Sequence, residues 1–372
     1  MAQNPCQLLH HAGTAVWMDQ LSRVIVEQGE LVRFIEQAAL TGVTSNPAIF
    51  EKAMSTGTAY DEQLRQLAKS DLGTEQVYEE LAVRDIQLAC DRLRPVYEKL
   101  GGQDGFVSLE VSPHLARDTE GTYQAARRLH GKVDRPNLLI KIPGTDEGAP
   151  AIERCLAEGI PINITLLFSI AAYETVAEAY VRALEKRAAA GQSLDVGSVA
   201  SFFVSRIDTL TDEKLEAKAG GDSALLALRG KIAIANAKLA YQSFLRIFES
   251  DRFRKLAQKG ARVQRPLWAS TSTKNPDYRD VVYVETLIGR DTVNTMPIQT
   301  IEAFLDHGVV RPQTVEDDVE GARAALAQLE EHGISFTAIT DQLLDEAIQK
   351  FNEPYDKLLA ALERKRNALR AS

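Results

Sequence analysis

The sequence predicts an α/β protein, a (β/α)8 TIM barrel with additional helices, notably at the C-terminus. Roughly eight short apolar runs alternate along the chain with longer segments whose apolar residues recur at helical spacing. Strands separated by helices indicate βαβ units and a parallel sheet. A doubly wound sheet is the structural alternative, and the lack of a glycine-rich dinucleotide fingerprint after an early strand disfavours it.

Each predicted strand is a short apolar run bounded by polar or helical sequence. In chain order the predicted strands are residues 14–19, 42–46, 106–111, 137–142, 161–167, 199–204, 265–270 and 292–296. Between them, segments such as 21–40 and 222–248 carry apolar residues at helical spacing and predict helices. Residues 51–100 are expected to form a helical insertion or a long second helix.

The segment after the last strand, residues 299–372, is highly charged and predicts further helices packed on the barrel. No low-complexity stretch, Pro/Gly linker or long charge run marks a domain boundary. Residues 1–372 are therefore expected to form a single barrel domain. Barrels with insertions run from about 200 to more than 400 residues, so the length is compatible.

The composition is that of a globular protein, with 45% hydrophobic and 26% charged residues and a formal net charge of −9. This acidic balance argues against nucleic acid or an anionic membrane as partner, but it leaves room for a small anionic ligand. Three scattered cysteines (Cys6, Cys90 and Cys155) suggest reduced thiols. With neither a signal peptide nor a bilayer-spanning stretch, we expect a soluble, cytoplasmic protein, either monomer or homodimer.

Strand alternation predicts a polar interior at one end of the barrel. In residues 137–142, Leu138, Ile140 and Ile142 share one face and Lys141 lies on the other. Because the apolar set must meet the surrounding helices, the polar set should project into the barrel. The polar residues expected to converge near the carboxyl ends of their strands are Asp19, Asn46, Glu110, Lys141 and Thr165.

Each of these residues also has a simpler interpretation. Lys141 and Glu110 could lie on solvated strand faces, and Thr165 could be an ordinary strand former. Asp19 could cap the following helix, and Asn46 could cap a helix that begins at the next residue, a proline. The simple interpretations are weaker jointly, because all five would have to fall by accident on the same face and end of successive strands.

Several motifs resemble the transaldolase family. TGVTSNPAIF (41–50) resembles its Asn-Pro motif, and LIKIPGTDEGAPAI (139–152) resembles the motif that carries its Schiff-base lysine. The resemblance continues in order through VSLEVS, NITLLFS, SFFVSR and WASTSTKNP, and the length is similar to that of the longer branch of the family. It implies a (β/α)8 barrel of the class I aldolase type with the lysine on the fourth strand, where the strand count independently places Lys141.

The resemblance also implies roles for individual residues. Lys141 corresponds to the amine that forms the imine, and Asp19 to the acid–base group for carbon–carbon cleavage. Glu110 and Thr165 correspond to the pair that handles a catalytic water, and Asn46 to a ligand of the dihydroxyacetone hydroxyls.

Further correspondences concern the remainder of the substrate pocket. Ser201 and Phe203 match pocket positions, and Arg206 and Ser270 match phosphate ligands. A second arginine found in shorter members is missing, and Lys274 is a hypothetical replacement whose alternative is a surface lysine. Arg206 has an alternative of its own, a surface ion pair with Asp208 or Asp212.

The activity implied is reversible transfer of a dihydroxyacetone unit from sedoheptulose 7-phosphate to glyceraldehyde 3-phosphate, which gives erythrose 4-phosphate and fructose 6-phosphate. This reaction belongs to the non-oxidative pentose phosphate pathway. It needs no cofactor or metal, because the protonated imine serves as the electron sink. The alternatives are a fructose 6-phosphate aldolase-like lyase, a phosphosugar isomerase, and a catalytically silent sugar-phosphate-binding barrel.

Overall fold

Eight parallel strands close into a barrel in the order in which they occur along the chain. The computed structural model describes residues 3–371. The strands are β1 Thr14–Met18, β2 Leu40–Val43, β3 Phe106–Glu110, β4 Leu138–Pro143, β5 Ile162–Leu167, β6 Ser198–Phe203, β7 Arg265–Ala269 and β8 Thr292–Met296. Each sequential pair is parallel, and β1 pairs with β8 to complete the ring. The predicted (β/α)8 barrel is confirmed.

The second strand was predicted too late in the chain. We expected residues 42–46, whereas β2 covers Leu40–Val43. The backbone leaves the sheet because Asn46 is the N-cap of helix α4 (Pro47–Ser55), whose first residue is a proline. Proline at this position costs no hydrogen bond and presets a helical φ, so the helix begins where a longer strand would have continued.

Helices surround the barrel. From the amino terminus up to β8 they are α1 Pro5–His11, α2 Arg23–Glu27, α3 Glu30–Gln37, α4 Pro47–Ser55, α5 Asp61–Ala68, α6 Thr74–Lys99, α7 Thr119–Val133, α8 Gly148–Ala157, α9 Ile170–Ala189, α10 Ser205–Ala219, α11 Ser223–Leu226, α12 Ile232–Phe248, α13 Asp251–Ala257 and α14 Val282–Glu285. The region 51–100 is thus an insertion of successive helices between β2 and β3, with α6 the longest of them. None of the described helices is both long and apolar enough to cross a bilayer.

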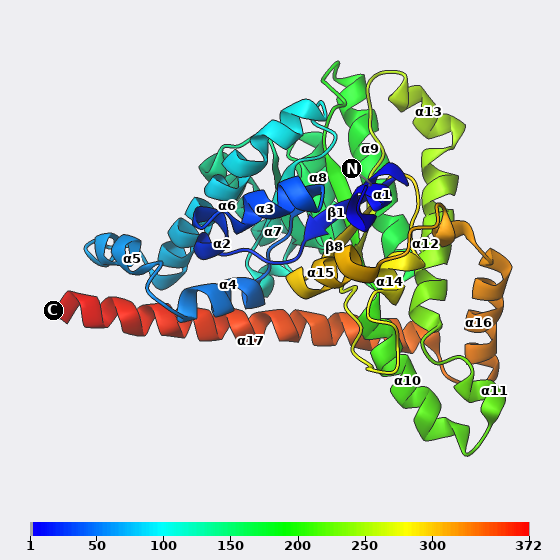
Figure 1. Ribbon diagram of the computed structural model, residues 1–372. Coiled ribbons are helices and arrows are strands. Elements are labelled where there is room, and N and C mark those ends of the chain that lie inside the picture. Colours follow the sequence, from blue (N-terminus) through cyan, green and yellow to red (C-terminus); the bar gives the residue numbers. More distant parts are fainter. Residues whose placement is uncertain (1–2, 372) are drawn as a thin grey trace.

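The C-terminal region consists of α15 (Ile298–His307), α16 (Val319–Glu331) and α17 (Phe336–Ala371). Figure 1 shows α17 as the long red helix that lies alongside α4 and reaches α5. It also contacts α6, α10 and β5. We propose that the chain forms one domain, because a single apolar core includes side chains from Cys6 to Leu362.

A buried tryptophan, Trp17, lies at the end of the barrel where β3 and β7 begin. The Trp17 indole N–H donates to Asp104 (2.9 Å), whose carboxylate also accepts from Thr41 (2.9 Å) and Arg265 (3.0 Å). Gly42 faces this indole, and a Cβ there would lie 2.3 Å from the ring. The sheet therefore needs a glycine at this position.

Candidate active site

Polar side chains form a hydrogen-bonded layer across the barrel interior. Asn163 Nδ2 donates to Ser108 Oγ (3.0 Å), and Asn163 Oδ1 accepts from Ser201 Oγ (2.7 Å). All three side chains are buried. These side chains project into the barrel, as strand alternation predicts for the polar residues of its strands, and Ser201 lies among them.

Lys141 lies inside the barrel, on the side of this polar layer that is nearer the carboxyl ends of the strands. Its side chain is 5% exposed, and its Nζ lies 3.2 Å from Glu110 Oε2 and 3.1 Å from the carbonyl oxygen of Ser45, to which it donates a hydrogen bond. The register of β3 against β4 pairs Glu110 with Lys141 directly, which explains why the two side chains meet. The simpler interpretation of both residues, a solvated strand face, is wrong.

Glu110 is a buried carboxyl group with an unusual environment. Burial raises its pKa from 4.5 to about 7, against the lowering effect of Lys141, while the charge of Asp19 raises it further. Neither carboxylate oxygen has hydrogen-bond geometry with any described residue, although the ion-pair distance to Lys141 is short. Buried polar atoms of this kind normally have a partner, so these oxygens mark a position for a water or a substrate group.

The Thr165 hydroxyl supplies a further buried oxygen without a hydrogen-bond partner among the described residues. The residue is fully buried, and its Oγ1 has no hydrogen-bond partner among residues 3–371. It pairs with Pro143 in the β4–β5 register, and the following residue, Leu166, has a φ of +59° where that strand is irregular. A positive φ is uncommon for a residue other than glycine, and such outliers cluster at functional sites.

Asp19 follows β1 and is half-buried. Its Oδ1 accepts a hydrogen bond from Thr44 Oγ1 (2.8 Å), and Thr44 also contacts Thr295 Oγ1 (2.9 Å). Helix α2 is capped instead by Ser22. The simpler interpretation of Asp19 as a helix cap is therefore wrong, and its carboxylate is held toward the barrel mouth.

Asn46 does act as a helix cap. Its Oδ1 accepts from the Ile49 N–H (2.9 Å) at the start of α4. The cap uses only the amide oxygen, and Nδ2 remains available to a ligand. Asn46 and Asp19 line the same cleft of about 590 Å³, which lies between α4 and the loops after β1 and β8.

Arg206 lies at the beginning of α10 and forms no ion pair with any described residue. Its guanidinium lies 5.4 Å from the centre of the Phe203 ring, and its Nη1 is buried with no partner among the described residues. Burial lowers the pKa of Arg206, while the charges of Asp19 and Glu346 act to raise it.

The alternative for Arg206, an ion pair with Asp208 or Asp212, is wrong. Asp208 accepts from the Ala233 N–H (2.7 Å) and from the Tyr283 hydroxyl (2.8 Å). Asp212 is likewise engaged by a backbone N–H (3.0 Å) and a tyrosine hydroxyl (2.6 Å). Both carboxylates are therefore engaged in hydrogen bonds with other parts of the fold, and neither forms an ion pair with Arg206.

Two further predicted phosphate ligands lie near this arginine. Ser270 has a φ of +55°, and its hydroxyl lies 3.0 Å from that of Ser205, the first residue of α10. Burial lowers the pKa of Lys274, and the charge of Arg206 lowers it further, so the two cations share one region. Lys274 Nζ donates to Ser272 Oγ (2.7 Å). A helix N-terminus with adjacent cations is a favourable setting for an anion.

Some contributors could not be found by reasoning from the motifs one strand at a time. The Ser45 carbonyl and the Thr44 hydroxyl lie within the 41–50 motif, but only their contacts with Lys141 and Asp19 reveal their use. Phe351 of α17 lies with its ring centre 5.7 Å from Lys141 Nζ. Nothing local in the sequence signals this contact.

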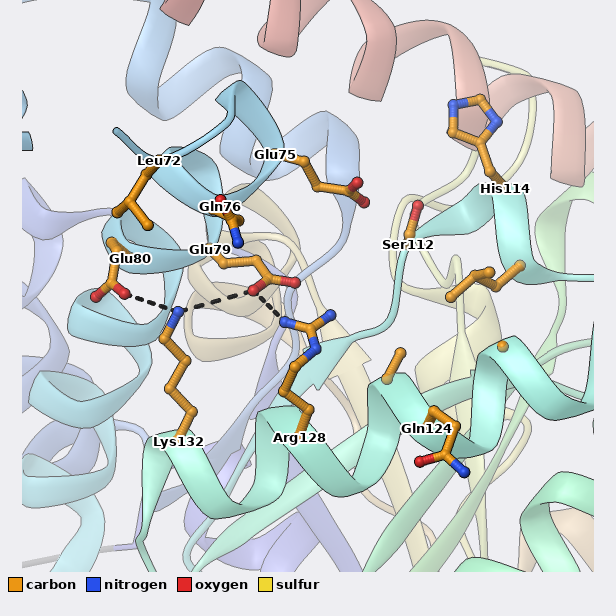
Figure 2. Close-up of a pocket in the computed structure, with 13 residues that line it drawn as sticks. Leu72, Glu75, Gln76, Glu79, Glu80, Ser112, His114, Gln124, Arg128 and Lys132 are labelled. Atoms are coloured by element: carbon orange, nitrogen blue, oxygen red, sulfur yellow. Dashed lines mark hydrogen bonds and ion pairs between the residues drawn. The ribbon is translucent and has the colours of Figure 1, made fainter. Parts of the chain in front are cut away.

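A larger groove of about 900 Å³ lies outside the barrel, between α6 and α7. Figure 2 shows its ion pairs, in which Arg128 and Lys132 contact Glu79 and Lys132 also contacts Glu80. None of the predicted site residues lines it. Among the described residues, no group of His, Cys, Asp and Glu side chains could hold a metal ion.

Comparison with known proteins shows the family to which the chain belongs. The sequence model described as "Transaldolase/Fructose-6-phosphate aldolase" matches residues 16–362. The chain is 48% identical to "Transaldolase 2" of Nostoc sp. (strain PCC 7120 / SAG 25.82 / UTEX 2576), with 98% of each chain covered. It is 49% identical to "Transaldolase" of Thermobifida fusca (strain YX), with 96% of each covered, and 47% identical to "Transaldolase" of Mycolicibacterium smegmatis, with 98% of each covered. The chain belongs to the transaldolase/fructose-6-phosphate aldolase family.

Proposed function

We propose that this protein is a transaldolase that transfers a dihydroxyacetone unit through an imine on Lys141. The donor is sedoheptulose 7-phosphate and the acceptor glyceraldehyde 3-phosphate, as in the non-oxidative pentose phosphate pathway. The observation that carries the proposal is the buried contact between Lys141 and Glu110 inside the closed barrel. The relatives named transaldolase, which match nearly the whole chain, support the reaction class.

The first chemical stage joins the amine of Lys141 to the ketose carbonyl and expels water. This step needs a group that can give and then take back a proton within hydrogen-bond reach. Glu110, with a pKa of about 7, can exist in both forms near neutral pH. Thr165, whose hydroxyl has no hydrogen-bond partner within residues 3–371, would position the water.

The second stage breaks a carbon–carbon bond and needs a separate base. Asp19 lies half-buried after β1, and the Thr44 hydroxyl holds its carboxylate in place. It would take the hydroxyl proton as the bond breaks and return it when the acceptor adds. The free amide N–H₂ of Asn46, in the same cleft, would bind hydroxyls of the three-carbon unit.

The phosphate of the substrate would bind where α10 begins. Arg206 has a buried guanidinium nitrogen that no described residue pairs with, and an arginine can contact a phosphate through two parallel hydrogen bonds. Ser270 and Lys274 would complete this site. Phe203, against which the guanidinium rests, would form the pocket wall.

A lyase that releases free dihydroxyacetone is the second candidate, because the matching family description includes fructose-6-phosphate aldolase. Borohydride reduction in the presence of fructose 6-phosphate should leave one reduced three-carbon adduct on the peptide that contains Lys141. No adduct should form in Lys141→Arg, and an adduct on another lysine would refute the proposal. Comparing transfer to an aldose phosphate with release of dihydroxyacetone then separates the two enzymes.

The cytoplasmic location and the choice between monomer and homodimer stay predictions. The three cysteines are buried and unpaired with one another, which fits a reducing compartment.

A further inference from the structure

The residues proposed for imine chemistry lie in a closed part of the barrel. Lys141 and Glu110 are only 4% and 6% exposed, and Thr165 is 0% exposed. The cleft that contains Asp19 and Asn46 does not include the lysine. Part of the protein therefore covers the amine.

The cover comes from α17. Phe351 is 4% exposed, and the centre of its ring lies 5.7 Å from Lys141 Nζ. The same helix contacts α4, which begins next to Asn46, and α10, which carries Arg206. Glu346, earlier on α17, is close enough to Arg206 to act on its pKa. Helix α17 thus reaches both ends of the proposed substrate site.

Helix α17 is anchored immediately after this phenylalanine. The Tyr355 hydroxyl donates to Glu75 Oε1 (2.8 Å), and Asp356 contacts His114 Nε2 (2.8 Å). Tyr355 is itself buried. These contacts to α6 and to the loop after β3 make Phe351 a fixed wall of the chamber.

We propose that Phe351 is a positioning residue that closes the chamber over Lys141 and thereby favours transfer of the three-carbon unit over its release to water. The inference rests on the proposed imine at Lys141. After cleavage, the enamine carbon has two fates. It can attack the carbonyl carbon of an aldose, which forms a carbon–carbon bond, or it can take a proton from water.

Protonation by water leads to release of the unit. Water then adds to the imine carbon, the carbon–nitrogen bond breaks, and dihydroxyacetone leaves with the amine restored. This route needs water beside the amine before an acceptor has bound. The Phe351 ring occupies volume next to Nζ that water other than the one held by Glu110 and Thr165 would otherwise enter, which disfavours the competing reaction.

The test compares Phe351→Ala and Phe351→Leu with Leu358→Ala. Leu358 is fully buried on the same helix, about two helical turns after Phe351, so it controls for general loosening of α17. Each protein receives fructose 6-phosphate and erythrose 4-phosphate. The measured quantity is free dihydroxyacetone released per unit transferred. Borohydride trapping on Lys141 verifies that each variant folds and forms the imine.

We expect this ratio to rise by about ten-fold in Phe351→Ala, equivalent to about 1.4 kcal/mol between the two barriers, and by less in Phe351→Leu. Leu358→Ala should keep the wild-type ratio. The inference is overturned if both Phe351 variants trap normally and keep the wild-type ratio, or if Leu358→Ala raises the ratio equally. If Phe351→Ala does not fold, Phe351→Leu decides. Failure of the wild-type protein to trap any adduct on Lys141 would instead refute the proposed function.

Discussion

Replacing Glu110 by glutamine keeps the volume of the side chain but removes a titratable proton beside Lys141. Glu110 is the buried carboxyl group within ion-pair distance of the amine, and its pKa is raised to about 7 by burial. Loss of a positioned general acid–base group costs typically 10²–10⁴-fold in rate. We expect kcat of Glu110→Gln to fall by about this factor, because imine formation becomes slow.

The assay for this prediction is single-turnover trapping with borohydride across a range of pH. In the wild-type protein the rate of adduct formation should change through an inflection near pH 7, where Glu110 titrates. In Glu110→Gln the inflection should be absent, and the trapping rate should fall in proportion to kcat. An unchanged trapping rate, or an inflection that survives the substitution, would show that Glu110 does not carry the proton.

The same group should make stability depend on pH. Because the folded-state pKa lies above 4.5, the folded protein binds more protons than the unfolded chain between about pH 4.5 and 7. The unfolding free energy should therefore decrease as pH rises through that window and change no further above it. A rise from 4.5 to about 7 corresponds to about 3 kcal/mol at 1.36 kcal/mol per pKa unit. Denaturant unfolding at several pH values should show this decrease in the unfolding free energy of the wild-type protein, and Glu110→Gln should lack it.

Three further predictions concern separate parts of the fold. Asp19→Asn should still trap the ketose on Lys141 but should lose about 10²–10⁴-fold in cleavage rate, measured as aldose released; normal cleavage would rule out Asp19 as the base. Arg206→Ala should raise KM for phosphorylated aldoses without raising it for glyceraldehyde, and an equal rise for both would place the phosphate elsewhere. Gly42→Ala should lower the unfolding free energy by about 1–3 kcal/mol or more, because the new methyl group meets the Trp17 indole; a denaturation midpoint equal to wild type would contradict this packing argument.

The sequence by itself determined the barrel and the inward direction of its polar side chains. Both follow from local rules, because a strand alternates its faces and βαβ units give parallel neighbours. Lys141 and Glu110 could be assigned to the interior only by comparing the polar faces of several strands, because each residue alone also fits a solvated face. The register that then brings them to 3.2 Å depends on pairing β3 with β4.

Only the tertiary structure decided how the site is closed and how its groups are paired. The predicted end of β2 was wrong because a helix cap at Asn46 competes with continuation of the strand. Whether the strand or the helix forms there depends on what the helix packs against. The cover over Lys141 comes from Phe351, on the last helix of the chain. Helical periodicity shows that α17 has an apolar side, but it carries no information about which distant residue that side will meet. That choice is made by the packing of the whole barrel.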